Sequence, residues 1–343
     1  MKRLLVISHV LPFPGHSGQE MRVRNSLREL KRKFHITFLT IGNKSDIQDL
    51  HAKATEYWDE LVCLPSKYNR NIAIKILYKA LAHIRSYTSG LKVSNYLIGD
   101  LELSPKRIEA ALAGREFDCV LLEYWHGYKC SKLFKARGIP SILDMHNVLG
   151  ESNFAHRRQN PLISKKLQNK NLDRYRFAEE QAWRLFDGIV AINKLEFQYV
   201  KERVKSDTEL FYVPMGIELN DLKYCWNPNV DIPRIAYYGG LESPHNVQSA
   251  MDCYHKIMPD IWKEFPKAEL WIVGSGPPES LREIGRKDKR VVVTGFVDDL
   301  AVVLSTMVAV VCPWQGTYGF RSRLIEVMAL GVPVVTTSAA VYG

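Results

Sequence analysis

Glycine-rich turns follow short apolar runs in the second half of the chain, where they could bring a ligand close to the backbone. Gly274 and Gly276 come directly after the run 269–273. Glycines let the backbone approach a ligand closely, and a bend into a helix presents N–H groups to an anion. The turn 295–298 follows the next run, and its backbone groups, those of Val297 among them, could hydrogen-bond a base edge. Each turn alone is equally typical of a loop without a ligand.

The strongest chemical signal is the loop 315–321 with the helix that follows it. Glu326 lies about one turn inside that helix, where its carboxylate could accept two hydroxyl hydrogen bonds, as a ribose offers. The helix N-terminus and Arg321 or Arg323 would meet a diphosphate. An alternative is that Glu326 only complements the helix dipole while both arginines are solvated.

Two series of alternating strands and helices must position these turns. Short apolar runs separated by helical segments are typical of parallel sheets that are covered on both faces. In the first series we expect strands at 4–10, 35–41, 119–125, 140–146 and 187–193. In the second we expect strands at 234–240, 269–276, 290–296, 308–314 and 332–338. Helical spacing is found at 21–33, 171–186, 246–265 and 322–330.

The pattern therefore predicts an α/β protein with two doubly wound, Rossmann-like domains. Pro228 and Pro233, with polar residues between them, indicate a linker near 225–233. We divide the chain into domains 1–228 and 229–343. In open parallel sheets ligands lie beyond the carboxyl ends of the strands, which is where the glycine-rich turns fall.

Composition and charge narrow the class of protein. The 343 residues can form two full cores, and the net charge of +10 suits a protein that meets phosphates, although a solvated basic surface explains it equally. No run reaches the 18 to 20 apolar residues of a membrane span. The six cysteines show no zinc or redox spacing, so reduced thiols in a cytoplasmic protein are the simplest account.

The segment Glu326–Val335, EVMALGVPVV, resembles the retaining glycosyltransferases of family 4, also called group 1, which have the GT-B fold. The resemblance extends back through FPKAELWIVGSGP and VTGFVDD and covers most of 234–338. It implies two Rossmann-like domains facing across a cleft, an acceptor-side domain before residue 229 and a nucleotide-sugar domain after it. It also implies transfer of a sugar with retention of anomeric configuration.

The resemblance assigns roles within this segment and reveals a departure. Glu326 is the ribose-binding carboxylate, and Gly319 and Phe320 line the donor site. The family's other glutamate, which touches the transferred sugar, would stand at position 318, where this chain has Tyr318. We therefore expect catalytic contacts from Tyr318 and Arg321.

A second departure follows the strand at 234–240. Many family members have an arginine and a lysine there that hold the diphosphate, whereas this chain has Gly239-Gly240-Leu241-Glu242. The sequence is similar to a subgroup found among exopolysaccharide-type transferases. Gly240 would lie against the donor, and we infer that Arg321 and Arg323 supply the missing positive charge.

Two features of the first half match the family's cleft. Gly18 lies in the glycine-bearing loop after the first strand, and Arg22 and Arg24 follow it. His146 ends a strand at the place where family members have a histidine that contacts the donor sugar. A proline- and glycine-rich turn with surface arginines, and a structural histidine, are the alternatives.

The resemblance implies no cofactor beyond the UDP- or GDP-linked donor. The sequence has no Asp-x-Asp and no histidine–carboxylate cluster at metal spacing, so we expect no metal. Helix dipoles and cations could stabilise the departing nucleoside diphosphate.

The acceptor is expected to be a saccharide or a lipid-linked molecule, in surface polysaccharide or glycolipid synthesis. Residues 71–87 combine isoleucine and leucine with Lys75, Lys79 and Arg85, which could rest on an anionic membrane at its inner, cytoplasmic face. A core-packed helix with a solvated basic edge is as good an account. The basic cluster 156–170 could extend such a surface.

Other functions remain open. A nucleotide-sugar epimerase or hydrolase has the same two-domain build, and the two departures also fit a catalytically impaired nucleotide-sugar-binding protein. Nucleic-acid binding is disfavoured, because basic residues do not interleave with aromatic ones. The sequence stops at 340–343, just past a strand, whereas family members continue, so we expect an incomplete second domain.

Overall fold

A computed structural model describes residues 1–15, 17–42, 54–89, 92–150, 165–217, 224–314 and 321–341. The described residues up to Met215 pack as one compact unit, and those from Gly216 to Val341 as another. The domain boundary expected between 228 and 229 therefore falls a short way inside the second unit. Each unit is a parallel sheet with helices on both faces, so the α/β, Rossmann-like architecture is confirmed.

The first unit contains a seven-stranded parallel sheet in the order β3-β2-β1-β4-β5-β6-β7. Its strands are β1 (Lys2–Ile7), β2 (Phe34–Ile41), β3 (Glu60–Leu64), β4 (Cys119–Glu123), β5 (Ser141–Asp144), β6 (Gly188–Ala191) and β7 (Glu209–Tyr212). Sequence patterning missed β3 and β7, the two edge strands. An edge strand exposes part of its side chains, so it does not give the continuous apolar run of a central strand.

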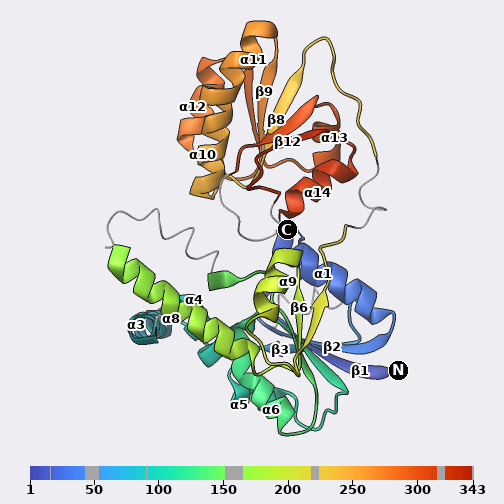
Figure 1. The fold of residues 1–343 in the computed structure, drawn as a ribbon, viewed down its shortest axis with the longest axis vertical. Coiled ribbons are helices and arrows are strands. Elements are labelled where there is room, and N and C mark those ends of the chain that lie inside the picture. Colours follow the sequence, from blue (N-terminus) through green and yellow to red (C-terminus); the bar gives the residue numbers. More distant parts are fainter. Residues whose placement is uncertain are drawn as a thin grey trace. The chain divides into compact units, whose positions relative to one another are not determined.

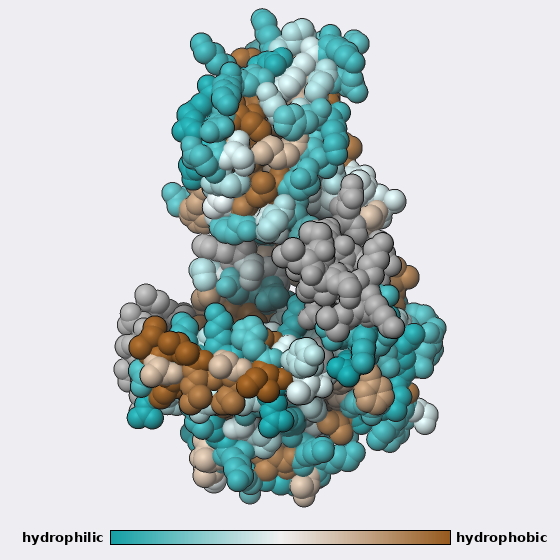
Figure 2. Space-filling view, turned by 90° about the vertical axis from the view of Figure 1, so that its left-hand side faces the viewer, coloured by the Kyte–Doolittle hydropathy of each residue, from teal (hydrophilic) through white to brown (hydrophobic). Residues whose placement is uncertain are grey.

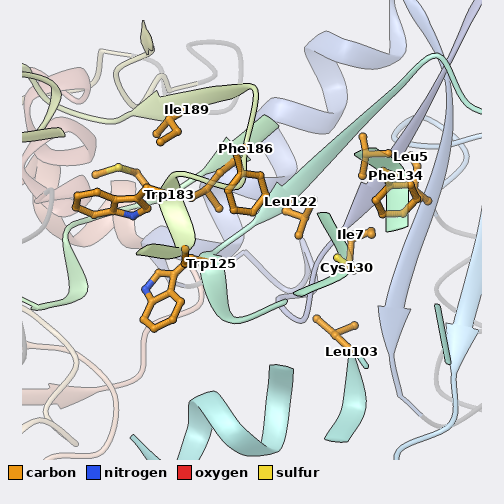
Figure 3. Packing of buried hydrophobic residues seen from close by; sticks show 14 of the residues in the cluster. Leu5, Ile7, Leu103, Leu122, Trp125, Cys130, Phe134, Trp183, Phe186 and Ile189 are labelled. Atoms are coloured by element: carbon orange, nitrogen blue, oxygen red, sulfur yellow. The ribbon is translucent and has the colours of Figure 1, made fainter. Parts of the chain in front are cut away.

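The helices of this unit cover both faces of the sheet. They are α1 (Gly18–Lys31), α3 (Ile72–Ser89), α4 (Val93–Asn95), the π-helix η1 (Tyr96–Glu102), α5 (Pro105–Ala111), the 3-10 helix η2 (Trp125–Cys130), α6 (Ser131–Lys135), α8 (Lys165–Trp183) and α9 (Lys194–Lys201). Alternation along β1 sends Leu5 and Ile7 into one core and Leu4 and Val6 into the other. Figure 3 shows the first core, where Trp125 and Trp183 are fully buried.

The second unit contains a five-stranded parallel sheet in the order β10-β9-β8-β11-β12. Its strands are β8 (Arg234–Tyr238), β9 (Glu269–Val273), β10 (Val291–Gly295), β11 (Ala309–Cys312) and β12 (Val334–Thr336). Its helices are α10 (Pro244–Asp252), the π-helix η3 (Cys253–Ile257), α11 (Met258–Glu264), α12 (Glu279–Lys287), α13 (Leu300–Ser305) and α14 (Ser322–Ala329). Figure 1 shows α10, α11 and α12 on one side of this sheet and α13 and α14 on the other.

The helix expected at 246–265 is interrupted in the structure. The chain passes from α10 through the π-turn η3 into α11, whose second residue is Pro259. Proline has no N–H to donate within a helix, so the hydrogen-bonding pattern changes just before it. The topology is unaffected.

None of the helices in the described parts of the chain is long and apolar enough to cross a membrane.

Candidate functional site

The carboxyl ends of β8 and β11 form the reversal point of the second sheet. The chain proceeds from β8 toward β9 and β10 on one side, whereas β11 and β12 lie on the other. The loops after β8 and β11 therefore diverge and leave room for a ligand. The described residues that the sequence placed in the donor site of this unit follow β8, β9, β10 and β11.

Glu326 is held by a tyrosine at the end of β8. The Tyr238 hydroxyl donates a hydrogen bond to Glu326 Oε2 at 3.1 Å. Burial raises the pKa of Tyr238, and the nearby Glu326 charge raises it further. The hydroxyl therefore stays protonated and can act as the donor. This contact orients the carboxylate that the sequence assigned to the ribose.

Three of the predicted glycines lie together around the ends of β8 and β9. Gly274 has φ +152°, and a Cβ on it would lie 1.8 Å from the Gly239 carbonyl oxygen. Gly276 has φ +64°, and a Cβ there would lie 2.6 Å from the Glu242 carboxyl carbon. Gly240 follows the end of β8, and its carbonyl accepts a hydrogen bond from Asn246 at 2.7 Å. Two of these positions thus require glycine for steric and conformational reasons.

The two predicted arginines begin α14. Arg321 is the N-cap residue of this helix, and its guanidinium carbon lies 5.4 Å from the ring centroid of Trp314. The Arg323 guanidinium carbon lies 5.6 Å from the ring centroid of Tyr238. Arg323 and Glu326 therefore both meet Tyr238, and the structure brings them to one edge of the sheet.

The other predicted residues of this unit are less informative. Val297 follows β10 and packs partly buried against the core, beside the exposed side chain of Phe296. Tyr318, Gly319 and Phe320 lie outside the described residues.

His146 occupies the corresponding edge of the first sheet, just after β5. Its Nε2 lies 2.5 Å from Glu123 Oε2 at the end of β4, and both side chains are buried. The ring stacks on Tyr124, with centroids 4.1 Å apart and planes 16° from parallel. Both residues have positive φ, +66° at Tyr124 and +56° at His146. Such backbone strain in non-glycine residues concentrates at functional sites, which makes this pair a candidate.

Burial shapes the protonation of the neighbouring groups. Burial, and then the Asp144 charge, raise the pKa of Glu123, whereas the hydrogen bond from His146 lowers it. The rings of His9 and His126 also lie against Tyr124, at 5.3 and 5.7 Å between centroids. Burial lowers the pKa of His9 to about 4 and that of His126 to about 3. Both are therefore neutral at physiological pH.

Arg22, which follows the glycine-bearing loop, is buried and paired with Asp144, so it is not the surface arginine of the alternative interpretation. Its Nε lies 2.9 Å from both carboxylate oxygens of Asp144, and its Nη1 donates to the Val213 carbonyl at 3.1 Å. The pair is almost completely buried. Arg22 thus neutralises a buried carboxylate next to His146.

Glu123, Asp144 and His146 also form a cluster that sequence spacing did not reveal. One ligand atom from each lies within 4.8 Å of the others, a geometry that could hold a metal ion. In the structure Asp144 is paired with Arg22, and Glu123 with His146. Glu123 ends β4, whereas Asp144 and His146 lie together at the end of β5, so no single short motif contains all three residues.

Gly18 is the first residue of α1. The Ser17 hydroxyl accepts a hydrogen bond from the Glu20 N–H, and the Glu20 carboxylate accepts one from the Ser17 N–H. A second N–H, that of Gly15, donates to the same carboxylate at 3.2 Å. The N-terminus of α1 therefore carries a capping box made by Ser17 and Glu20.

Sequence reasoning missed Tyr238, Glu123 and Tyr124. The available signal was polar character at the last position of a strand or just after it, as in the run CVLLEYW. A carboxylate in a strand buried on both faces needs a partner, and that need was a usable clue.

The second unit matches a known family. Residues 232–342 match the family model described as glycosyl transferases group 1. No curated protein matches the sequence.

Solved structures share the whole architecture at low sequence identity. Sucrose-phosphate synthase from Thermosynechococcus elongatus superposes with a TM-score of 0.64 at 16% identity, covering 98% of this chain and 82% of that one. TarM of S. aureus gives 0.61 at 11%, covering 98% and 84%. HepE of Anabaena, in complex with UDP and glucose, gives 0.55 at 10%, covering 98% and 81%. The chain therefore has the GT-B fold of glycosyltransferases, and its second unit matches the group 1 glycosyl transferases.

Proposed function

We propose that the protein transfers a sugar from a UDP- or GDP-linked donor to a saccharide or lipid-linked acceptor, with retention of anomeric configuration. The observation that carries this proposal is the arrangement of Gly240, Gly274, Gly276, Arg323 and Glu326 at one edge of the second sheet. Glycines allow close approach, a carboxylate suits ribose hydroxyls, and a guanidinium suits a diphosphate.

The similarity to known glycosyltransferases also supports this proposal. The match to group 1 glycosyl transferases covers all five of these residues. HepE was solved with UDP and glucose, and a TarM mutant with Fondaparinux, alpha-GlcNAc-glycerol and UDP. We propose by analogy that this protein acts in surface polysaccharide or glycolipid synthesis.

Nucleotide binding is the first test. UDP, GDP, ADP and CDP, with their common sugar conjugates, are added singly, and the melting temperature is measured. A ligand at a hundred times its Kd stabilises the native state by about 2.7 kcal/mol, which is a readily measured shift. Glu326→Ala is the matched variant and should show a much smaller shift at the same ligand concentration. If no nucleotide raises the melting temperature of the wild type, the proposal is wrong.

Turnover measurements then distinguish a transferase from a hydrolase, an epimerase or a catalytically impaired binding protein. The active donor is incubated alone and with oligosaccharide or lipid-linked acceptors, and the product anomer is read by NMR. Rapid consumption of donor without acceptor would instead identify a hydrolase or epimerase. Binding without turnover under any condition would identify a catalytically impaired binding protein. An inverted product would refute retention.

We propose a transfer that needs no metal ion. Glu123, Asp144 and His146 could bind one, but Arg22 and the Glu123–His146 hydrogen bond already compensate their charges. Dialysis against EDTA, followed by addition of Mg²⁺, Mn²⁺ or Ca²⁺, should leave the rate unchanged. A rate that falls on dialysis and returns with one of these ions would assign the cluster to a metal.

We propose further that the protein is cytoplasmic and rests on the inner face of the membrane through α3. One face of this helix exposes large apolar side chains, those of Ile72, Ile76, Leu77, Leu81, Ile84 and Tyr87. Figure 2 shows a band of brown and tan residues along this helix. The opposite face packs through Ala82, which is fully buried.

Basic residues flank this apolar face. On a helical projection Lys75 and Lys79 lie along one border and Arg85 along the other, and all three are exposed. An apolar face between cations suits an interface with anionic lipid, where the apolar side chains enter the headgroup region. A protein held there would meet a lipid-linked acceptor directly.

Vesicle sedimentation tests the membrane proposal. We expect binding to vesicles containing phosphatidylglycerol, weaker binding at high salt, and little binding to phosphatidylcholine alone. Ile76→Asp should weaken binding at least about tenfold, because the variant loses the burial of a whole apolar side chain. Val302→Asp, at a similarly exposed apolar position on α13, is the control. Equal loss in both variants, or equal binding to both lipids, would contradict the proposal.

A further inference from the structure

We propose that Arg323 holds the donor diphosphate over Gly240, and that Glu242 occupies this anion site until the donor displaces it. The inference rests on the proposed function. It concerns the loop after β8, where the sequence has neither of the cations that the resemblance leads one to expect.

Arg323 reaches this loop from the other side of the reversal point. A Cβ added to Gly240 would lie 3.3 Å from Arg323 Nη2. The guanidinium therefore fills the space that a side chain at position 240 would enter. Gly240 stands where the family has its arginine, so the positive charge is kept at the same place but is supplied from α14. Glycine at 240 is what makes room for it.

Tyr238 fixes the position of this cation. The Arg323 guanidinium carbon lies 5.6 Å from the Tyr238 ring centroid, within range of a cation–π contact. The side chain is partly buried. A partly buried guanidinium held in this position suits an anion such as a diphosphate.

The loop itself is rigid and offers little adjustment. The Gly239 N–H donates to the Val273 carbonyl at 3.0 Å, and the Leu241 N–H donates to the Ser275 carbonyl at 2.8 Å. The Gly240 carbonyl is held by Asn246. The backbone on which the diphosphate would rest is thus preorganised.

Glu242 covers the two glycines that should admit the ligand. Its Oε2 lies 3.1 Å from the position of a Cβ on Gly240, and its Oε1 lies 2.6 Å from that of a Cβ on Gly276. Both the Glu242 carboxylate and Arg323 therefore meet the same point above Gly240. Glu242 is an exposed side chain, so it can rotate away into solvent. Its negative charge must leave before a diphosphate can bind there.

The experiment measures affinity by calorimetry for the nucleoside diphosphate that binds best and for its parent nucleoside. Arg323→Ala should weaken the diphosphate about 10- to 100-fold, the range for a charge-assisted hydrogen bond, and leave the nucleoside unchanged. Glu242→Gln should tighten the diphosphate by about threefold, as expected for removing a nearby exposed charge. Arg286→Ala, an exposed arginine of α12, is the control.

The most discriminating variant moves the positive charge from position 323 to position 240. Gly240→Arg in the Arg323→Ala background should restore most of the diphosphate affinity, because the cation returns to the same place. Gly240→Arg alone should bind more weakly than this double variant, because the new side chain meets Arg323.

The inference is overturned if Arg323→Ala leaves diphosphate affinity unchanged, or if it weakens the nucleoside equally. It is also overturned if Glu242→Gln weakens the diphosphate. A wild type that binds no nucleoside diphosphate would instead overturn the proposed function, so the two failures are distinguishable.

Discussion

The Tyr238 hydroxyl lies 3.1 Å from Glu326 Oε2, joining the end of β8 to the middle of α14. The two residues are separated by 88 positions in the sequence. The contact keeps the Glu326 side chain at the carboxyl edge of the sheet. A carboxylate oriented in advance binds hydroxyl groups at a lower entropic cost.

Glu326→Ala should weaken nucleoside diphosphate binding about 10- to 100-fold, because hydrogen bonds to a charged acceptor contribute about 1.5–3 kcal/mol. Tyr238→Phe should weaken it less, by about fivefold, since only the orienting bond is lost. Calorimetry with the 2′,3′-dideoxy analogue provides the control: its affinity should not respond to Glu326→Ala. Equal losses for both ligands would show that Glu326 does not bind the ribose.

His146→Ala should lower kcat by about a hundredfold, the order found when a preorganised hydrogen-bond donor is removed from a reacting group. Glu123→Ala should have a similar effect, since it frees the imidazole from its 2.5 Å partner. Glu123→Gln should retain most of the activity, because its amide oxygen still accepts from Nε2–H. Donor affinity and melting temperature are measured alongside. If the Gln variant is as inactive as the Ala variant, the orienting role is refuted.

Arg22→Met should destabilise the protein by about 3–5 kcal/mol, because it leaves Asp144 as an unpaired buried charge. The double variant Arg22→Met/Asp144→Leu should recover much of that loss, since both members of this buried ion pair are removed. Urea unfolding measures both. The exposed pair Arg137–Glu109 is the comparison, and Arg137→Ala should cost no more than about 1 kcal/mol. A double variant as unstable as the single one would contradict this account.

Stability should fall as the pH rises from about 6.5 to about 8, above the range in which the buried neutral His9 and His126 have the opposite effect. Burial raises the pKa of Glu179 from 4.5 to about 8, although the N–H groups of Leu149 and Gly150 donate to its carboxylate. In this window the folded chain keeps a proton that the unfolded chain has released, so folding becomes less favourable with rising pH, by up to about 1.4 kcal/mol per unit. Burial raises the pKa of Glu196 to about 7, which adds to the effect.

Glu179→Gln tests this pH dependence through melting temperatures measured between pH 6.5 and 8. The variant should be less stable at low pH, because the amide accepts one hydrogen bond fewer, and its melting temperature should vary less with pH. Glu180→Gln, at a more exposed neighbouring position, is the control. A wild type whose stability rises across this range would contradict the prediction.

Local patterning was sufficient for most of the fold because the central strands are buried on both faces. Runs such as LLVI in β1 and VLL in β4 are apolar without interruption, and each leads into a helical segment. The edge strand β7 was missed because most of its side chains are exposed. The interruption at η3 was missed because the helical period continues through Pro259.

The sequence by itself determined that Glu326 and the glycine turns follow strands that end at one sheet edge. The position of a residue just after a strand can be read from the local sequence. In a parallel sheet all such residues lie at the same edge. Only the tertiary structure decided that Tyr238 meets Glu326, that Arg323 fills the space above Gly240, and that His146 is held by Glu123. Those contacts join side chains from different strands and helices, and their pairing depends on how the elements pack around the sheet.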